Sequence, residues 1–267
     1  MNETITRSLS GFIYISLLVS ATLFSKESFL LLFGLFLLQS ISEFCNLIQL
    51  EKIPALILAG FLYLIFSFLL PNDLFIDTGL IIISIIILIQ LMIWLFKNTS
   101  TPSSKISKWI LLIGYVILPF IFIVKIPSEH HFEPILIICI FILIWTNDTF
   151  AYIVGKSIGK NKLFESISPK KTIEGFVGGL LFSIIAGIII AYYSFLKTTS
   201  FWILTALFVS VFGTIGDLVE SKFKRIANVK DSGFIMPGHG GVLDRLDSII
   251  FVAPFLFLLH KIIAYVS

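Results

Sequence analysis

Long apolar segments follow one another along almost the whole of this chain. Of its 267 residues, 57% are hydrophobic and only 13% are charged, whereas soluble domains carry roughly 25% charged residues. A helix of about 20 apolar residues crosses the hydrocarbon core of a bilayer, and such a helix satisfies its own backbone hydrogen bonds there. We therefore expect an all-α integral membrane protein, built as a polytopic bundle of transmembrane helices.

Nine segments have the length and composition of a membrane-spanning helix. They lie at about residues 8–25, 28–48, 54–71, 74–96, 107–125, 133–155, 173–196, 200–219 and 246–266. Residues 1–130 hold five of these spans and show no recognisable chemistry. Residues 131–267 hold the other four together with two polar loops, 156–172 and 220–245, and are the expected catalytic region.

Lys and Arg residues are unevenly distributed between the two sets of loops. With nine spans and the N-terminus inside, fifteen of the 19 basic residues fall on the inner side and four on the outer side. Cytoplasmic loops carry an excess of Lys and Arg. The sequence therefore predicts a cytoplasmic N-terminus, an outer C-terminus and two cytoplasmic polar loops.

Two carboxylates mark the ends of the last two spans. Asp217 lies near the end of the eighth span and Asp244 opens the ninth, so both are expected at the same membrane surface. Charge beside hydrocarbon is costly and needs a reason, and Mg²⁺ often binds one or two carboxylates together with substrate phosphates. We predict a Mg²⁺ site at Asp217 and Asp244, although either acid alone could simply mark a helix end.

A glycine-rich turn leads into the ninth span and consists of Gly238, His239, Gly240 and Gly241. Glycines allow close backbone approach, so successive N–H groups can hold an anion, and the helix N-terminus adds its positive dipole end. His239 could donate to a phosphate oxygen or transfer a proton. Taken alone, the turn is equally typical of a flexible loop with a surface histidine.

Basic residues precede this turn. Arg suits bidentate phosphate recognition and Lys supplies a point charge, so we predict phosphate contacts for Arg225 and Lys230, just before Asp231. Lys222 is explained well enough as a residue that sets the topology or contacts anionic lipids.

The end of the sixth span carries a second group of candidates. Asn147 and Asp148 lie within that otherwise apolar span, and acids inside a membrane are functional candidates by default. The loop that follows supplies four more: Ser168, Lys170, Lys171 and Glu174. A basic loop that only sets the topology and starts a helix is the plainer interpretation.

The long polar segment resembles the signature of the phosphatidate cytidylyltransferase family, also called CDP-diacylglycerol synthases. The matching residues run Ser221-x-x-Lys224-Arg225-x4-Lys230-Asp231-x-Gly233-x3-Pro237-Gly238-His239-Gly240-Gly241-x2-Asp244-Arg245-x-Asp247. The stretch from Asp148 to Gly175 is similar to that family's second motif. Met236 stands where the family more often has a branched apolar residue or Phe, a size-conserving change.

The resemblance implies the transfer of CMP from CTP to phosphatidate, giving CDP-diacylglycerol and pyrophosphate in phospholipid biosynthesis. It implies Mg²⁺ as cofactor, with room for a second, monovalent cation. The expected setting is a bacterial plasma membrane with the site facing the cytoplasm. The partners are then CTP, phosphatidate and the bilayer, without nucleic acid, and a homodimer is compatible with the lipid-facing helices.

We assign roles on this basis. Asp217 and Asp244 would hold the metal with Asp148 in support, and Asp247 would orient Arg245 or the loop. The expected catalytic residues are Asp217, Asp231, Asp244, His239 and Lys230. The expected substrate-binding residues are Ser221, Lys224, Arg225, Arg245, Gly238, Gly240, Gly241, Asp148, Ser168, Lys170, Lys171 and Glu174.

Two other functions stay open at the level of sequence. Intramembrane Asp148 and the basic loops could serve a transporter of an anionic solute, although repeated halves are not evident. A CTP-using relative that acts on another lipid, such as a polyprenyl kinase or an ether-lipid cytidylyltransferase, would need the same headgroup chemistry. The two cysteines, Cys45 and Cys139, lie in apolar segments and are expected to be buried and unpaired.

Overall fold

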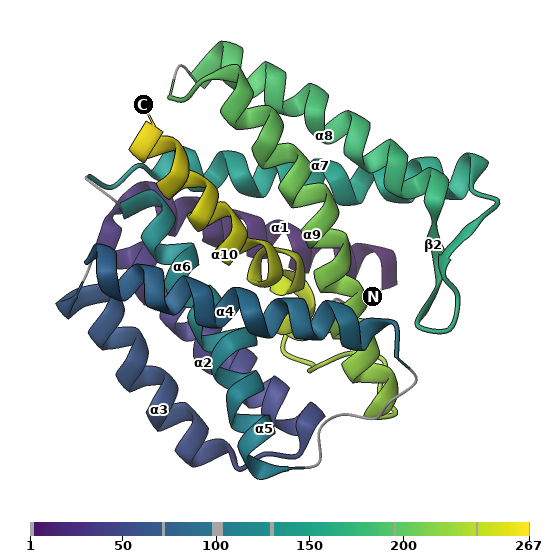
Figure 1. Cartoon of the computed structure of the whole chain (residues 1–267). Coiled ribbons are helices and arrows are strands. Elements are labelled where there is room, and N and C mark those ends of the chain that lie inside the picture. Colours follow the sequence, from purple (N-terminus) through teal and green to yellow (C-terminus); the bar gives the residue numbers. More distant parts are fainter. Residues whose placement is uncertain are drawn as a thin grey trace.

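The computed structural model describes residues 3–70, 73–97, 104–128, 131–194, 196–238 and 240–266. These residues are almost entirely helical (Figure 1). In chain order the elements are α1 (Glu3–Phe24), α2 (Lys26–Ile48), α3 (Lys52–Leu64), the π-helix η1 (Ile65–Leu69), α4 (Leu74–Leu95), α5 (Lys105–Leu111), the π-helix η2 (Leu112–Ile117), α6 (Leu118–Lys125), the 3-10 helix η3 (Ile126–Ser128), α7 (Pro134–Ile158), β1 (Lys162–Phe164), β2 (Ser168–Thr172), α8 (Ile173–Ser194), α9 (Thr199–Ile226) and α10 (Leu243–Val266).

Eight helical segments in the described part of the chain are long and apolar enough to cross a membrane. They are Lys26–Ile48, Lys52–Leu69, Leu74–Leu95, Lys105–Ser128, Pro134–Ile158, Ile173–Ser194, Thr199–Ile226 and Leu243–Ile263. The apolar part of α1, Ser8–Phe24, is shorter and sits at the lower limit of the ~17–25 residues that a span needs. The architecture is that of a polytopic helical membrane protein.

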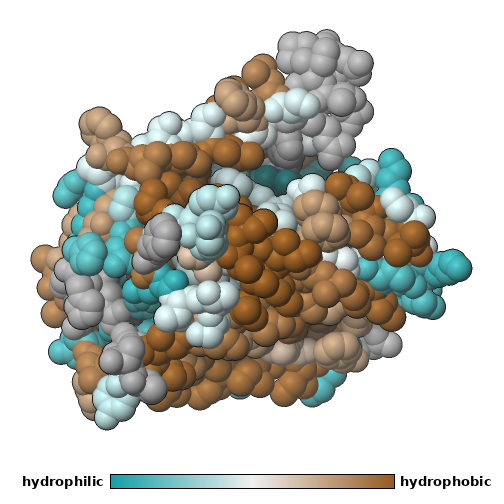
Figure 2. Space-filling model, turned by 90° about the horizontal axis from the view of Figure 1, so that it is seen from above, coloured by the Kyte–Doolittle hydropathy of each residue, from teal (hydrophilic) through white to brown (hydrophobic). Residues whose placement is uncertain are grey.

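The surface has the pattern that a bilayer requires. Figure 2 shows hydrophobic residues over most of the middle of the visible face, with hydrophilic residues gathered toward its left and right edges. Large apolar side chains such as Phe12, Ile57, Phe61 and Leu181 are more than half exposed. Soluble proteins rarely expose such continuous apolar area, so lipid is its natural surrounding.

One short hairpin corrects the expectation of a purely helical chain. Strands β1 and β2 pair antiparallel, with Lys162 opposite Thr172 and Phe164 opposite Ser168. The hairpin occupies the polar loop 156–172 and projects beyond the helix ends (Figure 1). Its strands, Lys-Leu-Phe and Ser-Pro-Lys-Lys-Thr, are too short and show no alternation from which a strand could be predicted.

The last helices pack closely because glycine allows it. A Cβ at Gly216 of α9 would lie 2.4 Å from the Cβ of Phe251 and 2.8 Å from the carbonyl oxygen of Asp247, both on α10. Small residues let membrane helices approach at the backbone. Gly216 therefore brings Asp217 beside the first turns of α10.

The N-terminal helices pack directly on this region. The ring centroid of Phe223 on α9 lies 5.2 Å from Phe44 on α2, 5.8 Å from Tyr115 on η2 and 4.7 Å from Trp94 on α4. These contacts fix α9 against the first half of the chain. Cys45 and Cys139 are buried and unpaired, which confirms that prediction.

A buried ion pair lies far from the polar loops. Lys125 Nζ on α6 lies 2.5 Å from Asp77 Oδ1 on α4, and Lys261 Nζ on α10 lies 3.8 Å from Asp77 Oδ2. Lys125 and Lys261 are two of the four basic residues that the sequence places on the outer side. The structure gives them a packing role, because a carboxylate buried between helices needs cationic partners.

Candidate functional site

A cavity of about 870 Å³ opens among α7, α8, α9, α10, α1 and the β hairpin. Its lining carries charges of both signs. The basic residues are Lys156, Lys162, Lys170, Lys171, Lys224 and Arg245, and the acidic residues are Asp148, Asp217, Asp231, Asp244 and Asp247. A space of this size with convergent polar groups is typical of a ligand site.

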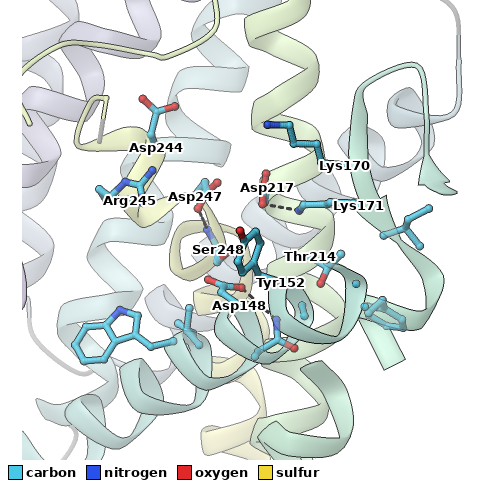
Figure 3. Close-up of a pocket in the computed structure, with 18 of the residues that line it drawn as sticks. Asp148, Tyr152, Lys170, Lys171, Thr214, Asp217, Asp244, Arg245, Asp247 and Ser248 are labelled. Atoms are coloured by element: carbon cyan, nitrogen blue, oxygen red, sulfur yellow. Dashed lines mark hydrogen bonds and ion pairs between the residues drawn. The ribbon is translucent and has the colours of Figure 1, made fainter. Parts of the chain in front are cut away.

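Three carboxylates from three helices point into the same space. Figure 3 shows Asp148 of α7, Asp217 of α9 and Asp247 of α10 around the middle of the cavity. Asp217 Oδ2 pairs with Lys171 Nζ at 2.5 Å, and its Oδ1 accepts from Ser221 Oγ at 3.2 Å. Each ionised carboxylate has about four lone-pair sites, so oxygen ligands remain available in the cavity.

Asp148 and Asp247 have even fewer protein partners. Asp148 Oδ1 accepts from Asn147 Nδ2 at 3.2 Å, and Asp247 Oδ1 accepts from the backbone N–H of Ser248 at 2.7 Å. Among the described residues neither acid forms an ion pair. Like charges this near one another favour a cation between them.

Asp244 has a different environment. Its Oδ1 accepts from Lys224 Nζ at 2.6 Å, and its Oδ2 accepts from the backbone N–H of Ser232, the hydroxyl of Ser232 and the backbone N–H of Gly241, each at 2.8 Å. Lys224 also pairs with buried Glu220. Four donors occupy this carboxylate, so its evident task is to hold the loop against α9.

The N-terminus of α10 is closed by carboxylates of the protein itself. The backbone N–H of Val242 donates to Glu43 Oε1 at 3.1 Å, and that of Leu243 donates to Glu43 Oε2 at 2.8 Å. Of the turn whose amides the sequence suggested for phosphate, Gly241 donates to Asp244, and the anion role of the turn stays a prediction. The carboxylates of Glu43 and Asp244 thus supply the negative charge that the positive end of the helix dipole favours.

The glycine-rich turn folds as a tight loop beside that helix. Gly238 and Gly240 have φ of 75° and 84°, which residues with a Cβ rarely adopt. Within the described residues neither of them, nor Gly241, lines the cavity. His239 lies outside the described residues.

Comparison with known proteins agrees with this geometry. The profile of the cytidylyltransferase family matches residues 5–263. A phosphatidate cytidylyltransferase of Bacillus subtilis (strain 168) is 39% identical over 223 residues, which cover 80% of this chain and 82% of that protein. The chain belongs to the cytidylyltransferase family.

Staphylococcal members of this family match over a shorter stretch. A phosphatidate cytidylyltransferase of Staphylococcus aureus (strain COL) is 48% identical over 150 residues, 55% of this chain and 56% of that protein. The one from Staphylococcus haemolyticus (strain JCSC1435) is 52% identical over 120 residues, 45% and 46% of the two chains. These two matches span about half the length of each staphylococcal protein.

The family signature divides into cavity residues and supporting residues. Of the predicted set, the cavity lining includes Asp148, Lys170, Lys171, Asp217, Lys224, Asp231, Asp244, Arg245 and Asp247. Within the described part of the chain, the lining does not include Ser168, Glu174, Ser221, Arg225, Lys230, Gly238, Gly240 or Gly241.

Several residues outside the lining have clear structural partners. Arg225 donates from Nε to the Ile167 carbonyl at 3.4 Å and from a terminal nitrogen to the Val229 carbonyl at 3.1 Å, so it braces the hairpin against the end of α9. Glu174 accepts from the backbone N–H groups of Lys160 and Asn161 and fixes the turn before β1. The phosphate contact predicted for Arg225 stays a prediction beside this bracing role.

Lys222 caps the C-terminal end of α4. Its Nζ donates to the carbonyls of Trp94 and Lys97, each at 2.6 Å, and lies 4.1 Å from the centroid of the Trp94 ring. A cation at a helix C-terminus is favourable because the last carbonyls lack partners. Lys222 therefore anchors α4 to α9.

Sequence reasoning missed two parts of the site. Helix α1 contributes Gly11, Tyr14 and Ile15 to the cavity wall, although its residues show no polar pattern. Glu43 is the other omission, and here a signal existed. It is an acid inside a predicted span, the same criterion that selected Asp148.

Proposed function

We propose that this protein transfers CMP from CTP to phosphatidate, giving CDP-diacylglycerol and pyrophosphate for phospholipid biosynthesis. Family membership and the names of its relatives support the reaction class. The observation that carries the proposal is the cavity in which the cations and acids of the signature meet at one end of the helix bundle. A triphosphate and a lipid phosphate need such a place to come together.

The cavity cations suit two anionic substrates. Lys156, Lys162, Lys170 and Arg245 form no ion pair with a carboxylate among the described residues, so they are available to phosphate oxygens. Preorganised positive charge lowers the repulsion between two phosphates and stabilises charge that develops during transfer. Apolar residues also line the cavity, including Phe141, Trp145 and Phe176, and suit the apolar part of a lipid substrate.

The reaction needs no protein nucleophile. An oxygen of the phosphatidate phosphate attacks the α-phosphorus of CTP, and the bond from that phosphorus to the oxygen bridging toward the β-phosphorus breaks. Pyrophosphate leaves with that bonding pair. The chain's residues hold both substrates in line and neutralise their charge, as in other phosphoryl transfers.

Mg²⁺ fits the acidic side of the cavity. The described residues contain no group of three or more His, Cys, Asp or Glu arranged as a complete metal site, but Mg²⁺ usually takes only one or two carboxylates plus substrate phosphates and water. Asp217, Asp148 and Asp247 offer open oxygens there, whereas the oxygens of Asp244 are occupied. When bound, the ion would neutralise phosphate charge, and a monovalent ion beside it stays part of the proposal.

The same proposal includes the topology. Nine spans with the N-terminus in the cytoplasm would put the cavity at the cytoplasmic face of a bacterial plasma membrane, which the Lys and Arg distribution supports. Labelling of single cysteines introduced at Lys160 and at Lys197 in sealed vesicles would test it, because only the latter should react from outside. The homodimer is a separate proposal, which the mass of the detergent-purified protein would test.

The decisive experiment follows the label of radioactive CTP. Purified protein is incubated in detergent with Mg²⁺ and phosphatidate, with and without EDTA, and the organic phase is counted. We expect a labelled lipid that forms only without EDTA. Folded protein that transfers nothing to phosphatidate, but labels another lipid phosphate or a polyprenol, would move the proposal to that acceptor. Solute flux in vesicles without CTP consumption would favour a transporter.

A further inference from the structure

An acid of the N-terminal half is buried against the family signature. Glu43, near the end of α2, is only 2% exposed. Burying a carboxylate is costly unless hydrogen bonds satisfy it. The sequence around Glu43 contains no recognisable catalytic motif. The presence of a buried acid there therefore needs an explanation.

Four hydrogen bonds satisfy Glu43, and three come from the opposite end of the chain. Oε1 accepts from the backbone N–H of Val242 at 3.1 Å and from Gln39 Nε2 at 2.8 Å. Oε2 accepts from the backbone N–H of Leu243 at 2.8 Å and lies 2.9 Å from the hydroxyl of Ser232, whose single hydrogen it shares with Asp244 Oδ2. Glu43 thus acts as the N-terminal cap of α10, supplied by a different helix.

At two positions of the signature only glycine fits, because the Glu43 carboxylate occupies the space that a Cβ would need. A Cβ at Gly233 would find its three nearest atoms all in Glu43, with Oε1 at 2.6 Å, Cδ at 2.8 Å and Cγ at 3.1 Å. A Cβ at Gly241 would lie 2.2 Å from Glu43 Oε2 and 2.5 Å from Ser232 Oγ. The side chain of Glu43 therefore lies between Gly233 and Gly241, in the loop formed by residues 231–238 and 240–242, here named the signature loop.

The contacts continue from Glu43 into the cavity. The hydroxyl of Ser232 lies within hydrogen-bond distance of both Glu43 Oε2 and Asp244 Oδ2. Asp244 in turn holds Lys224, and Asp247 follows three residues later on the same face of α10. The orientation of the first turn of α10, and with it of Asp247, depends on this cap.

We propose that Glu43 is a positioning residue for cytidylyl transfer: it holds the signature loop and the first turn of α10 in the arrangement that places Lys224, Arg245 and Asp247 on the cavity. The inference rests on the proposed function for its readout. It assigns to an N-terminal helix a specific part in a site that the C-terminal region otherwise supplies.

The first test compares E43Q with E51Q in the full-length protein. Glu51 provides a matched control because its side chain is 67% exposed and pairs with Lys105 at 3.0 Å, far from the signature loop. For E43Q we expect kcat/KM to fall about 10–100-fold, as when residues that orient catalytic groups are lost. The CTP concentration at half-maximal rate should also rise, whereas loss of folded protein alone would lower the rate without moving that concentration.

The second test uses the glycine. G233A should impair the enzyme much as E43Q does, because the new methyl displaces the Glu43 carboxylate. In an E43A background the same methyl meets no carboxylate, so G233A should add little further loss. G60A is the control, since a Cβ there has nothing within 4 Å and should leave activity unchanged in either background. If E43A does not fold, E43D, with its retracted oxygens, replaces it and should tolerate G233A better than the wild type does.

The outcomes separate clearly. E43Q with wild-type CTP dependence and rate, or losses of E43A and G233A that simply multiply, would overturn the inference. Rescue of the G233A defect in the Glu43 variants would support it. If the wild type labels no lipid at all, the proposed function fails, and the inference is then decided by the same comparison made on direct CTP binding.

Discussion

Two groups of charged residues lie at opposite ends of the helix bundle, and they differ in burial and in how the charge is balanced. Asp77, Lys125 and Lys261 form one group, and Asp148, Asp217 and Asp247 form the core of the other. On α10, about 25 Å of helix separates Lys261 from Asp244, at ~1.5 Å per residue. Both groups would satisfy a simple search for acids inside a membrane.

The group at Asp77 is closed. Lys125 Nζ bonds Asp77 Oδ1 at 2.5 Å and the Leu70 carbonyl at 3.3 Å, with both ionised side chains almost fully buried. The hollow beside it has about 230 Å³ and is lined mainly by apolar residues of α4 and α10. Here cations meet the acid directly, which leaves little for a ligand to do.

The group at Asp217 is open. Of its three carboxylates only Asp217 forms an ion pair among the described residues, with Lys171, and the cavity around them is several times larger than the hollow beside Asp77. Buried charge alone therefore does not identify a site. Unused ligand capacity next to accessible space does, because only then can a substrate or ion supply the missing interaction.

The largest effect should come from the open group. D217N removes the charge that faces Lys171 and the proposed ion, and we expect kcat to fall about 10²–10³-fold, the usual loss when one preorganised electrostatic contact is removed. The radiolabel assay measures it at saturating Mg²⁺. D73N is the matched control, because Asn is as good an N-cap as Asp, and it should keep full activity. Full activity in D217N would place the chemistry elsewhere.

The closed group should affect stability instead. D77N leaves the charge of Lys125 buried without its partner, which we expect to lower the free energy of unfolding by about 3–5 kcal/mol. Thermal unfolding in detergent measures this, and the rate per folded molecule should stay at the wild-type value. The double change of Asp77→Leu with Lys125→Met should recover much of the stability, since an apolar pair avoids the desolvation cost. A lasting loss of rate would mean that this end also serves catalysis.

Asp244 should behave differently from Asp217 although both belong to the signature. D244N keeps the size of the side chain but places an NH₂ group where donors now point, so the loop should loosen. We expect a lower melting temperature together with a slower rate, because each buried donor left unsatisfied costs about 1–3 kcal/mol. D217N should slow the rate with little change in melting temperature. Identical profiles for the two variants would argue for the shared metal site that the sequence suggested.

The smallest expected difference is between the activities of variants at two basic residues, Lys171 and Arg225. K171Q removes the partner of Asp217 and a cavity charge, and we expect the rate to fall about tenfold or more, since hydrogen bonds to charged groups contribute ~1.5–3 kcal/mol. R225Q removes only an exposed brace and should cost less than about threefold. Steady-state kinetics with varied CTP measure both. If the CTP concentration at half-maximal rate rose equally in K171Q and R225Q, the result would support the phosphate contact that the sequence predicts for Arg225.

The sequence alone determined the architecture of a polytopic helical membrane protein and predicted many of the residues that line the cavity. Span length and hydrophobicity are local properties, so predicted segments such as 28–48 and 74–96 coincide with α2 and α4 to within two residues. Charge that interrupts hydrocarbon is equally visible locally, and it selected Asp148, Asp217 and Asp244. The order of the signature residues was sufficient to indicate the family.

Only the tertiary structure decided which of these residues face the cavity. The backbone N–H groups of Val242 and Leu243 donate to Glu43, which lies about two hundred residues earlier in the chain. No periodicity or spacing in the sequence indicates such a contact. The same holds for Asp244, whose contacts with Lys224, Ser232 and Gly241 come from the tertiary structure, while the metal role that the sequence predicts for it stays a prediction. Hydrophobic pattern dictates that these helices form and cross the bilayer, but the close approaches at Gly216, Gly233 and Gly241 decide which carboxylates meet a cavity and which meet the protein.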